Sequence, residues 1–209
     1  MTLFPDDQFF TSGMPEKTVY SFPDADIVHF ENFFKKGVAD QYYTRFIDEI
    51  KWEQNNITIY GKEHKVPRLT AWYGEDKSYT YSNILNRPNP WIPELLEIKA
   101  CVEKEAEVIF TNVLLNLYRH GLDSVGWHRD NEKEFGEQPV IASVSFGESR
   151  IFQMRHKFRK DIKKIDIPLN HGSMLLMKGN TQEYWEHQVP KRRRSIVPRI
   201  NLTFRVINI

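Results

Sequence analysis

Cysteine, long apolar runs and net charge are all scarce in this sequence. The single cysteine, Cys101, cannot form an internal disulfide, which excludes a fold held together by disulfides and fits a reducing compartment. No apolar run reaches the roughly 18 residues of a membrane-spanning helix, and no basic stretch followed by an apolar one opens the chain, so we expect neither a membrane span nor a signal peptide. The net charge of +1 gives no overall basic field, so any signal for nucleic-acid binding has to be local. We expect an intracellular protein, cytoplasmic in a bacterium and nuclear in a eukaryote.

The composition is that of a folded chain. Of the 209 residues, 40% are hydrophobic and 27% are charged, which is enough apolar surface for a packed core. The length fits a single domain over 1–209, with an N-terminal extension and helix at 1–54. Residues 1–34 show no clean period, and we expect them to wrap the surface or to be partly loose. Apolar residues at three-to-four spacing predict helices over 36–52 and 93–109.

From residue 110 onward the pattern predicts short strands separated by turns. Repeated short strands without helices between them are typical of a sandwich or jelly roll. The expected fold class is therefore α+β with a mostly β core over 108–209. The expected strands cover 112–119, 124–129, 140–146, 149–155, 163–168, 173–177 and 199–208.

The segment Trp127-His-Arg-Asp130 carries a possible metal site. His128 and Asp130 are two residues apart, so on an extended chain both side chains lie on one face. Two imidazoles and one carboxylate can cap one face of a metal ion and leave other positions open, as in non-haem Fe(II) oxygenases. A lone H-x-D is common, however, and usually marks an ordinary surface or core histidine. His187 lies 57 residues after Asp130, a separation that carries no physical signal by itself. The spacing alone leaves both interpretations open.

The last expected strand alternates strictly between apolar and polar residues. Its polar face carries Arg199, Asn201, Thr203 and Arg205. Such a face is usually solvated, but arginine binds carboxylates by two parallel hydrogen bonds, so two arginines on one face also suit a small dicarboxylic acid. Asn116 and Tyr118 form a second polar pair at i, i+2, with Leu115 and Leu117 pointing the other way.

Several motifs occur together in one order: Asn116-x-Tyr118, Gly126-Trp-His-Arg-Asp130, Ile141-Ala-Ser-Val-Ser-Phe-Gly147, His187 and Arg199-x-Asn-Leu-Thr-Phe-Arg205. From about Ile59 to the C-terminus the chain resembles the AlkB family of Fe(II)/2-oxoglutarate dioxygenases, and most of all the branch that repairs double-stranded DNA. The resemblance implies a double-stranded β-helix with iron between its two sheets. It implies that the catalytic iron is bound by His128, Asp130 and His187. It also implies that 2-oxoglutarate is held by Asn116, Tyr118, Arg199, Asn201, Thr203 and Arg205.

Residues 55–85 are aromatic and basic together. Flat rings beside Lys62, Lys65 and Arg68 would stack bases and touch phosphates. The alternative is that the rings belong to the core, which the pattern leaves open for Trp72 and Tyr73. The stretch resembles the nucleotide-recognition lid of the family. There Tyr60 and Gly61 match the tip of a finger that enters the duplex, and Tyr79 and Tyr81 match positions beside the flipped base. The double-strand branch carries phenylalanine at the positions of Tyr60 and Tyr81.

Two further segments are candidates for substrate contacts. Asn131 and Glu132 follow the expected ligand Asp130 and are placed to read the exocyclic groups of a base. Related repair enzymes carry acids here, so Asn131 is a departure. The basic run Lys191-Arg192-Arg193-Arg194 would ordinarily be a solvated loop. In the double-strand branch, a basic run at the matching place grips the complementary strand.

The resemblance implies Fe(II), 2-oxoglutarate and O2 as cofactor and co-substrates. The reaction would remove N-alkyl groups oxidatively, for example from 1-methyladenine or 3-methylcytosine in DNA, as direct-reversal repair. The expected partner is alkylated DNA, or RNA, and we expect a monomer with no membrane association. The alternatives are the same chemistry on RNA or protein, or a metal-free jelly roll that senses a ligand. The intact triad and the two arginines argue against the metal-free reading.

Overall fold

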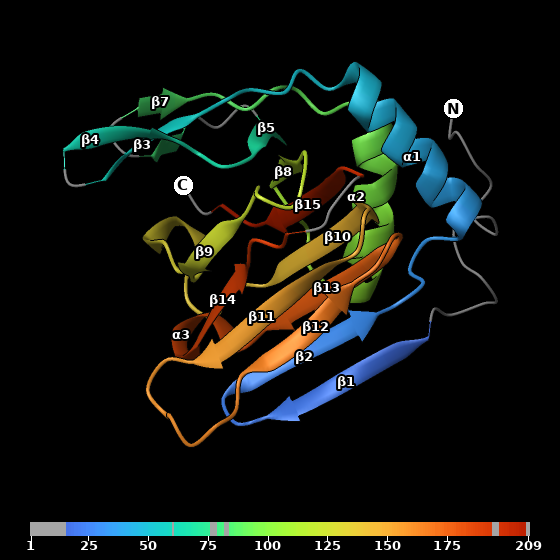
Figure 1. Ribbon diagram of the computed structural model, residues 1–209. Coiled ribbons are helices and arrows are strands. Elements are labelled where there is room, and N and C mark those ends of the chain that lie inside the picture. The colour runs from blue at the N-terminus through green and yellow to red at the C-terminus, as the bar shows by residue number, and fades with distance from the viewer. Residues whose placement is uncertain (1–15, 60, 76–78, 82–83, 194–196, 208–209) are drawn as a thin grey trace.

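The computed structural model describes residues 16–59, 61–75, 79–81, 84–193 and 197–207. Two antiparallel sheets lie one against the other, and two helices cover the outer face of the larger sheet (Figure 1). This arrangement confirms the mostly β jelly roll with N-terminal helices. The strand ends differ from the predicted ones by a few residues, as at the last strand, which ends at Arg205.

The larger sheet has seven strands, and the final strand of the chain lies near its middle. In spatial order the strands are β1 (Lys17–Phe22), β2 (Ala25–Phe30), β13 (Ser173–Lys178), β10 (Ile141–Gly147), β15 (Arg199–Arg205), β8 (Asn112–Tyr118) and β5 (Leu69–Gly74). β15 pairs with β8 over its whole length, with Arg199 opposite Tyr118 and Asn201 opposite Asn116. The polar residues Arg199 and Asn201 of β15 therefore lie beside Tyr118 and Asn116 of β8 on one face of the sheet.

The smaller sheet has four strands and carries both histidines of the motif. Its order is β12 (Ile165–Leu169), β11 (Arg150–His156), β14 (Trp185–Val189) and β9 (Val125–His128). His187 on β14 pairs directly with His128 on β9. Pairing of β14 with β9 thus brings together histidines that are far apart in the sequence.

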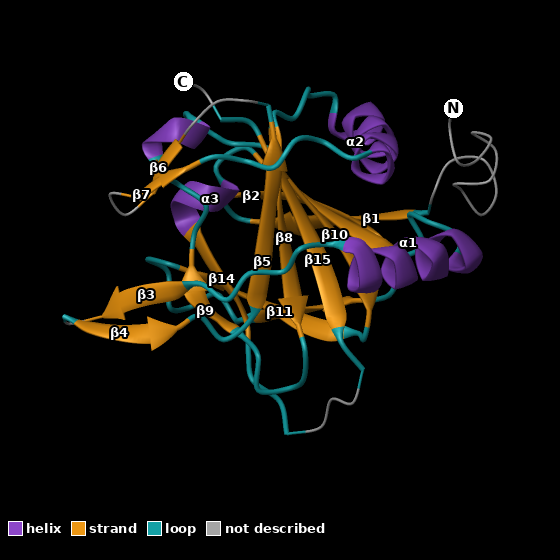
Figure 2. Cartoon of the chain, turned by 90° about the horizontal axis from the view of Figure 1, so that it is seen from above, coloured by secondary structure: helices purple, strands orange, loops and turns teal. Residues whose placement is uncertain are grey.

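The two helices form one core with the larger sheet. α1 (Lys36–Glu49) buries Val38, Tyr42 and Phe46, and α2 (Pro93–Ala106) begins with proline, which lacks the N–H that a first helical position leaves unpaired. Figure 2 shows both helices on the outer side of the large sheet. The structure also has two short helical turns, η2 (Lys133–Phe135) and α3 (Thr181–Tyr184). In the described part of the chain, none of the helices has the length and apolarity to cross a membrane.

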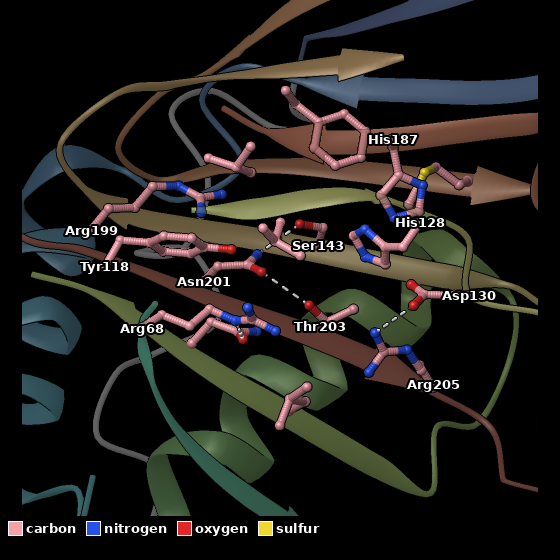
Figure 3. A pocket seen from close by; sticks show the side chains of 16 residues that line it. Arg68, Tyr118, His128, Asp130, Ser143, His187, Arg199, Asn201, Thr203 and Arg205 are labelled. Atoms are coloured by element: carbon pink, nitrogen blue, oxygen red, sulfur yellow. Dashed lines mark hydrogen bonds and ion pairs between the residues drawn. The ribbon is translucent and has the colours of Figure 1, made fainter. Parts of the chain in front are cut away.

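Alternation decides what each face of the central strands contacts. Ile200, Leu202 and Phe204 of β15 are fully buried in the core beneath the helices. The polar residues of β15 point the opposite way, toward the small sheet (Figure 3). The face that would ordinarily be solvated is therefore enclosed between the sheets.

The segment expected as a lid is divided in the structure. β3 (Asn56–Ile59) and β4 (Lys62–Lys65) form a hairpin, and β6 (Tyr79–Tyr81) and β7 (Ile84–Asn86) form another. Between them, β5 is the edge strand of the large sheet, and its Tyr73 is 6% exposed. Tyr73 is thus a core residue, and Trp72 is half-buried with its indole N–H donated to Asn112.

Strands β1, β2 and β14 differ from the sequence prediction. Residues 17–30 were expected to wrap the surface or lie loose, but they form β1 and β2 and extend the large sheet beyond β13. β2 is apolar on both faces, because Ile27 faces the small sheet and Phe30 faces the helices, so it shows no period of two. β14 was not predicted, although its alternate residues Trp185, His187 and Val189 are buried.

Candidate active site

Two histidines and one aspartate converge between the sheets. His128 ends β9, Asp130 follows it, and His187 lies in β14. One possible ligand atom from each residue lies within 4.8 Å of the others, and the two imidazole rings are 4.3 Å apart. Asp130 and His187 are 5% and 3% exposed (Figure 3). The three predicted ligands therefore form one cluster facing the pocket.

The protonation states of this cluster suit a metal. Burial, with His128 beside it, lowers the pKa of His187 to about 3, so the ring is neutral at pH 7 and keeps a lone pair for a ligand bond. Burial alone would raise the pKa of Asp130, but the Arg205 guanidinium, 2.9 Å from its Oδ1, lowers that pKa overall. The carboxylate is held ionised. Arg205, expected to hold the co-substrate, contacts the metal ligand Asp130; its contact with the co-substrate stays a prediction.

Other contacts fix the orientation of these ligands. His128 Nδ1 lies 2.8 Å from the carbonyl oxygen of Gly126; in the tautomer that donates this hydrogen bond, Nε2 is free to bind a metal. The backbone N–H of Asp130 donates to Oε1 of Gln182 at 3.0 Å, and Gln182 is 1% exposed. Gln182 lies in α3 immediately before β14. It therefore connects the segment carrying Asp130 to the one carrying His187.

The closed end of the pocket is built around Arg199. This side chain is 1% exposed and donates from Nη2 to Ser145 Oγ at 2.9 Å. Its Nε and Nη1 are buried and have no hydrogen-bond partner among the described residues. Burial lowers the pKa of Arg199 to about 10, which still leaves it charged at pH 7. A buried cation with two unused donors fits a carboxylate.

Between the closed end and the metal cluster, side chains of the pocket are hydrogen-bonded to one another. Asn201 donates to Ser143 Oγ at 2.7 Å and accepts from the Thr203 hydroxyl at 3.0 Å. On the neighbouring strands of the same sheet, Arg68 Nε donates to Asn116 Oδ1 at 2.7 Å. All six residues expected to hold the co-substrate line this pocket. Figure 3 shows Arg199 and Tyr118 at one end and Asp130 with Arg205 at the other.

The donors present fit Fe(II) and a dicarboxylic 2-oxo acid. Neutral imidazoles and one ionised carboxylate form the ligand set of non-haem Fe(II) oxygenases, which leaves three positions of an octahedral ion open. The unused N–H groups of Arg199 would receive a carboxylate at the far end of the pocket.

The predicted substrate residues are not all found together. Asn131 is exposed; Glu132 is half-buried, and its burial, together with Asp130, raises its pKa. Arg68 was expected to contact phosphates; its side chain donates to Asn116 and lines the pocket, so a phosphate contact stays a prediction. Gly61 lies in the β3–β4 turn with φ 75°, a conformation that favours glycine.

The remaining predictions fall partly beyond what the structure describes. Tyr60 and Arg194 lie outside the described residues, and Tyr79 and Tyr81 are described only as the backbone of β6. Arg192 pairs with Glu148 and donates to Ser149 O, whereas Arg193 is exposed.

Sequence reasoning missed Ser143, Ser145 and Gln182. The two serines alternate with buried apolar residues on β10, which was a usable signal for a polar inner face. Nothing in the sequence pairs Gln182 with Asp130, because that contact crosses between distant segments.

Comparison with known proteins defines the class. A model of the 2OG-Fe(II) oxygenase superfamily matches residues 26–205, and the chain belongs to this superfamily, whose name gives Fe(II) and 2-oxoglutarate as its cofactors. The solved structure titled "The structure of OsALKBH1" has the same fold, with a TM-score of 0.63 at 19% identity over 91% of this chain and all of that one.

Individual relatives confirm the resemblance to the AlkB family. The chain is 44% identical, over 81% of its length, to alpha-ketoglutarate-dependent dioxygenase alkB homolog 3 of Bos taurus. It is 38% identical, over 83% of its length, to the DNA oxidative demethylase ALKBH2 of Homo sapiens, and covers 70% of that protein. The chain spans 62% of the length of the alkB homolog 3 relatives from Bos taurus, Mus musculus and Homo sapiens.

Proposed function

We propose that this protein is an Fe(II)/2-oxoglutarate-dependent dioxygenase that removes N-alkyl groups from nucleic-acid bases, with alkylated DNA as its principal substrate. One observation carries the proposal: a His-Asp-His cluster and a buried arginine with unused donors lie in the same pocket. The cluster accounts for the metal and the arginine for the acid, so both requirements of the chemistry meet in one cavity.

The overall reaction balances without another reductant. O2 oxidises both 2-oxoglutarate, which loses CO2 to give succinate, and the N-alkyl carbon, which leaves as an aldehyde after hydroxylation. When bound, Fe(II) supplies the O2 chemistry. His128, Asp130 and His187 would hold it, while Arg199 and Tyr118 would orient the distal carboxylate of the acid. Arg205 would keep Asp130 ionised and immobile.

Nucleic acid is the substrate class that the surroundings favour. The β4 strand presents Lys62, His64 and Lys65, all exposed, on a hairpin beyond the sheets. Cations in an exposed hairpin suit phosphates, and a base flipped from the stack would reach the pocket. The relative ALKBH2 of Homo sapiens is named a DNA oxidative demethylase, which supports DNA as the substrate. Glu132 lies near the metal cluster, where it could contact the base.

The assay that tests the proposal follows succinate under Fe(II), 2-oxoglutarate and O2. Oligonucleotides with 1-methyladenine or 3-methylcytosine are compared as single-stranded DNA, duplex DNA and RNA, beside a methylated peptide. We expect succinate and formaldehyde in equal amounts, with DNA the best substrate. If RNA or peptide is turned over faster than DNA, that molecule and not DNA is the principal substrate. No stimulation by any of them, together with no 2-oxoglutarate binding, would favour a metal-free sensor.

A further inference from the structure

A second arginine lies behind the closed end of the pocket and is not one of its lining residues. Arg150 begins β11 and is 2% exposed. Its Nη2 donates to the carbonyl oxygens of Asp123 at 2.9 Å and Pro190 at 2.7 Å. Its guanidinium lies 5.6 Å from the centre of the Tyr118 ring, and that of Arg199 lies 5.2 Å from the same ring. One tyrosine thus contacts two buried cations.

The carboxylates near Arg150 are bound to other cations. The Asp123 side chain accepts two hydrogen bonds from the Arg119 guanidinium, at 2.8 and 3.0 Å, and one from the Arg119 backbone N–H at 2.9 Å. Glu148 is paired with Arg192. Within the described part of the chain, Arg150 has carbonyl partners but no hydrogen-bonded carboxylate. Its positive charge therefore remains available to act on a neighbouring anion.

Two buried positive charges beside one ring cost free energy, because both are desolvated and they repel each other. Burial lowers the pKa of both Arg150 and Arg199, and their mutual repulsion adds to the effect on Arg199. The contact of each guanidinium with the Tyr118 ring offsets part of this cost. A carboxylate bound at Arg199 would offset the rest, because it would interact with both charges in a medium that screens them weakly.

We propose that Arg150 is a positioning residue for the distal carboxylate of the co-substrate. It fixes the Tyr118 ring beside Arg199 and adds a second positive charge at the closed end. The site thereby selects a 2-oxo acid with two carboxylates over one with a single carboxylate. This inference rests on the proposed function, which supplies 2-oxoglutarate as the ligand.

The test compares two acids of equal chain length on protein loaded with Mn(II), without O2. 2-Oxoglutarate and 2-oxopentanoate share the metal-chelating end, and only the first carries the distal carboxylate. Binding is measured by titration calorimetry for wild type, Arg150→Gln and Arg150→Lys, with melting temperatures for each. Arg150→Gln keeps a donor for the carbonyls but loses the charge; Arg150→Lys keeps the charge.

We expect Arg150→Gln to weaken the binding of 2-oxoglutarate by about tenfold or more, and the binding of 2-oxopentanoate by less than about twofold. The dissociation constant of Arg150→Lys for 2-oxoglutarate should lie within about threefold of the wild-type value. The control is Arg155→Met on the same strand, which is exposed, pairs with Glu186, and should bind both acids as wild type does.

Two results would overturn the proposal. Equal loss for both acids in Arg150→Gln and Arg150→Lys, with lowered melting temperatures, would make Arg150 a structural residue only. Wild-type affinity for 2-oxoglutarate in Arg150→Gln would show that its charge plays no part. Wild-type protein that binds neither acid would instead refute the proposed function, and this inference with it.

Discussion

The pocket between the sheets and the basic surface outside it are built in opposite ways. In the pocket, Arg199, Asn201 and Asp130 are each less than 10% exposed and hydrogen-bonded to neighbouring side chains. On the outside, Lys62 and Lys65 of β4 are exposed on a two-stranded hairpin that no part of the main sheets pairs with.

Because of this difference, a substitution in the pocket and one on the basic surface should have effects of different size. A buried group that loses its partner leaves a charge or donor without solvation, so one substitution has a large, all-or-none effect. An exposed cation acts through screened charge, so its effect is small, additive and dependent on salt. Substitutions in the pocket should therefore change binding or turnover far more than substitutions on the basic surface.

Asp130→Ala should abolish succinate production. The change removes one metal ligand and leaves the largely buried Arg205 without its partner, which should destabilise the fold by up to about 3–5 kcal/mol. The apolar core beneath the helices and the one between the two sheets stay intact, so the protein should still fold. Turnover and urea unfolding measure both effects, and Asp166→Ala, an exposed acid on β12, is the control. Wild-type succinate production by Asp130→Ala would show that the triad assignment is wrong.

Arg199→Met should weaken 2-oxoglutarate binding by about 2–5 kcal/mol, because it removes one partner of a charge pair in a dry site. Metal affinity should stay unchanged, since Arg199 lies at the other end of the pocket. The apparent dissociation constant for 2-oxoglutarate measures the first effect, and a Mn(II) titration measures metal affinity. Arg159→Met removes an exposed arginine paired with Asp161 and should leave both constants unchanged. Equal behaviour of the two variants would refute the role given to Arg199.

The sequence predicted the pocket well because alternation is a local property. The polar face of β15 and the Asn116–Tyr118 pair followed from a period of two, and both line the pocket. The contacts between distant segments did not follow. That Arg205 contacts Asp130 depends on how the two sheets pack, and that Arg68 contacts Asn116 depends on the pairing of β5 with β8; no spacing along the chain encodes either.

The same reasoning explains the missed strands. β2 has apolar residues on both faces, and β14 carries Glu186, His187 and Gln188 in a row, so neither shows the pattern expected of a half-buried strand. The family resemblance selected His187 where periodicity could not. Only the pairing of β14 with β9 then explains why that histidine lies beside His128.

Gln182 is not a metal ligand, and Gln182→Leu tests whether it nevertheless affects metal affinity as strongly as a buried pocket residue should. Losing the hydrogen bond to the Asp130 backbone should lower metal affinity by about 10–100-fold. Mn(II) titration of the variant measures this. Gln153→Leu, on β11 with its amide bonded to Asp166, is the matched control and should bind Mn(II) as wild type does. An unchanged metal affinity in Gln182→Leu would make this contact purely structural.

The smallest effect is expected in the basic run, where the structure separates residues that look alike in the sequence. Arg192 and Arg193 are both exposed, but Arg192 is paired with Glu148 and donates to Ser149 O at 3.1 Å. A cation already paired releases fewer counterions when a phosphate replaces its partner. Each fully neutralised phosphate contributes roughly 0.9 to the slope of log affinity against log salt on duplex DNA.

Arg193→Ala should therefore flatten that slope by about 0.9, and Arg192→Ala by clearly less. Replacing Arg192, Arg193 and Arg194 together should flatten it by about two units rather than three, and should weaken duplex binding more than single-strand binding if the run reaches the complementary strand. Fluorescence anisotropy with methylated oligonucleotides across a salt series measures the slopes. Lys104→Ala, an exposed residue on α2, is the control. Equal slopes for wild type and the triple variant would make the run a solvated loop. A larger effect of Arg192 than of Arg193 would mean that binding breaks the pair with Glu148 and that this arginine, held in place beforehand, is the one that contacts the phosphate.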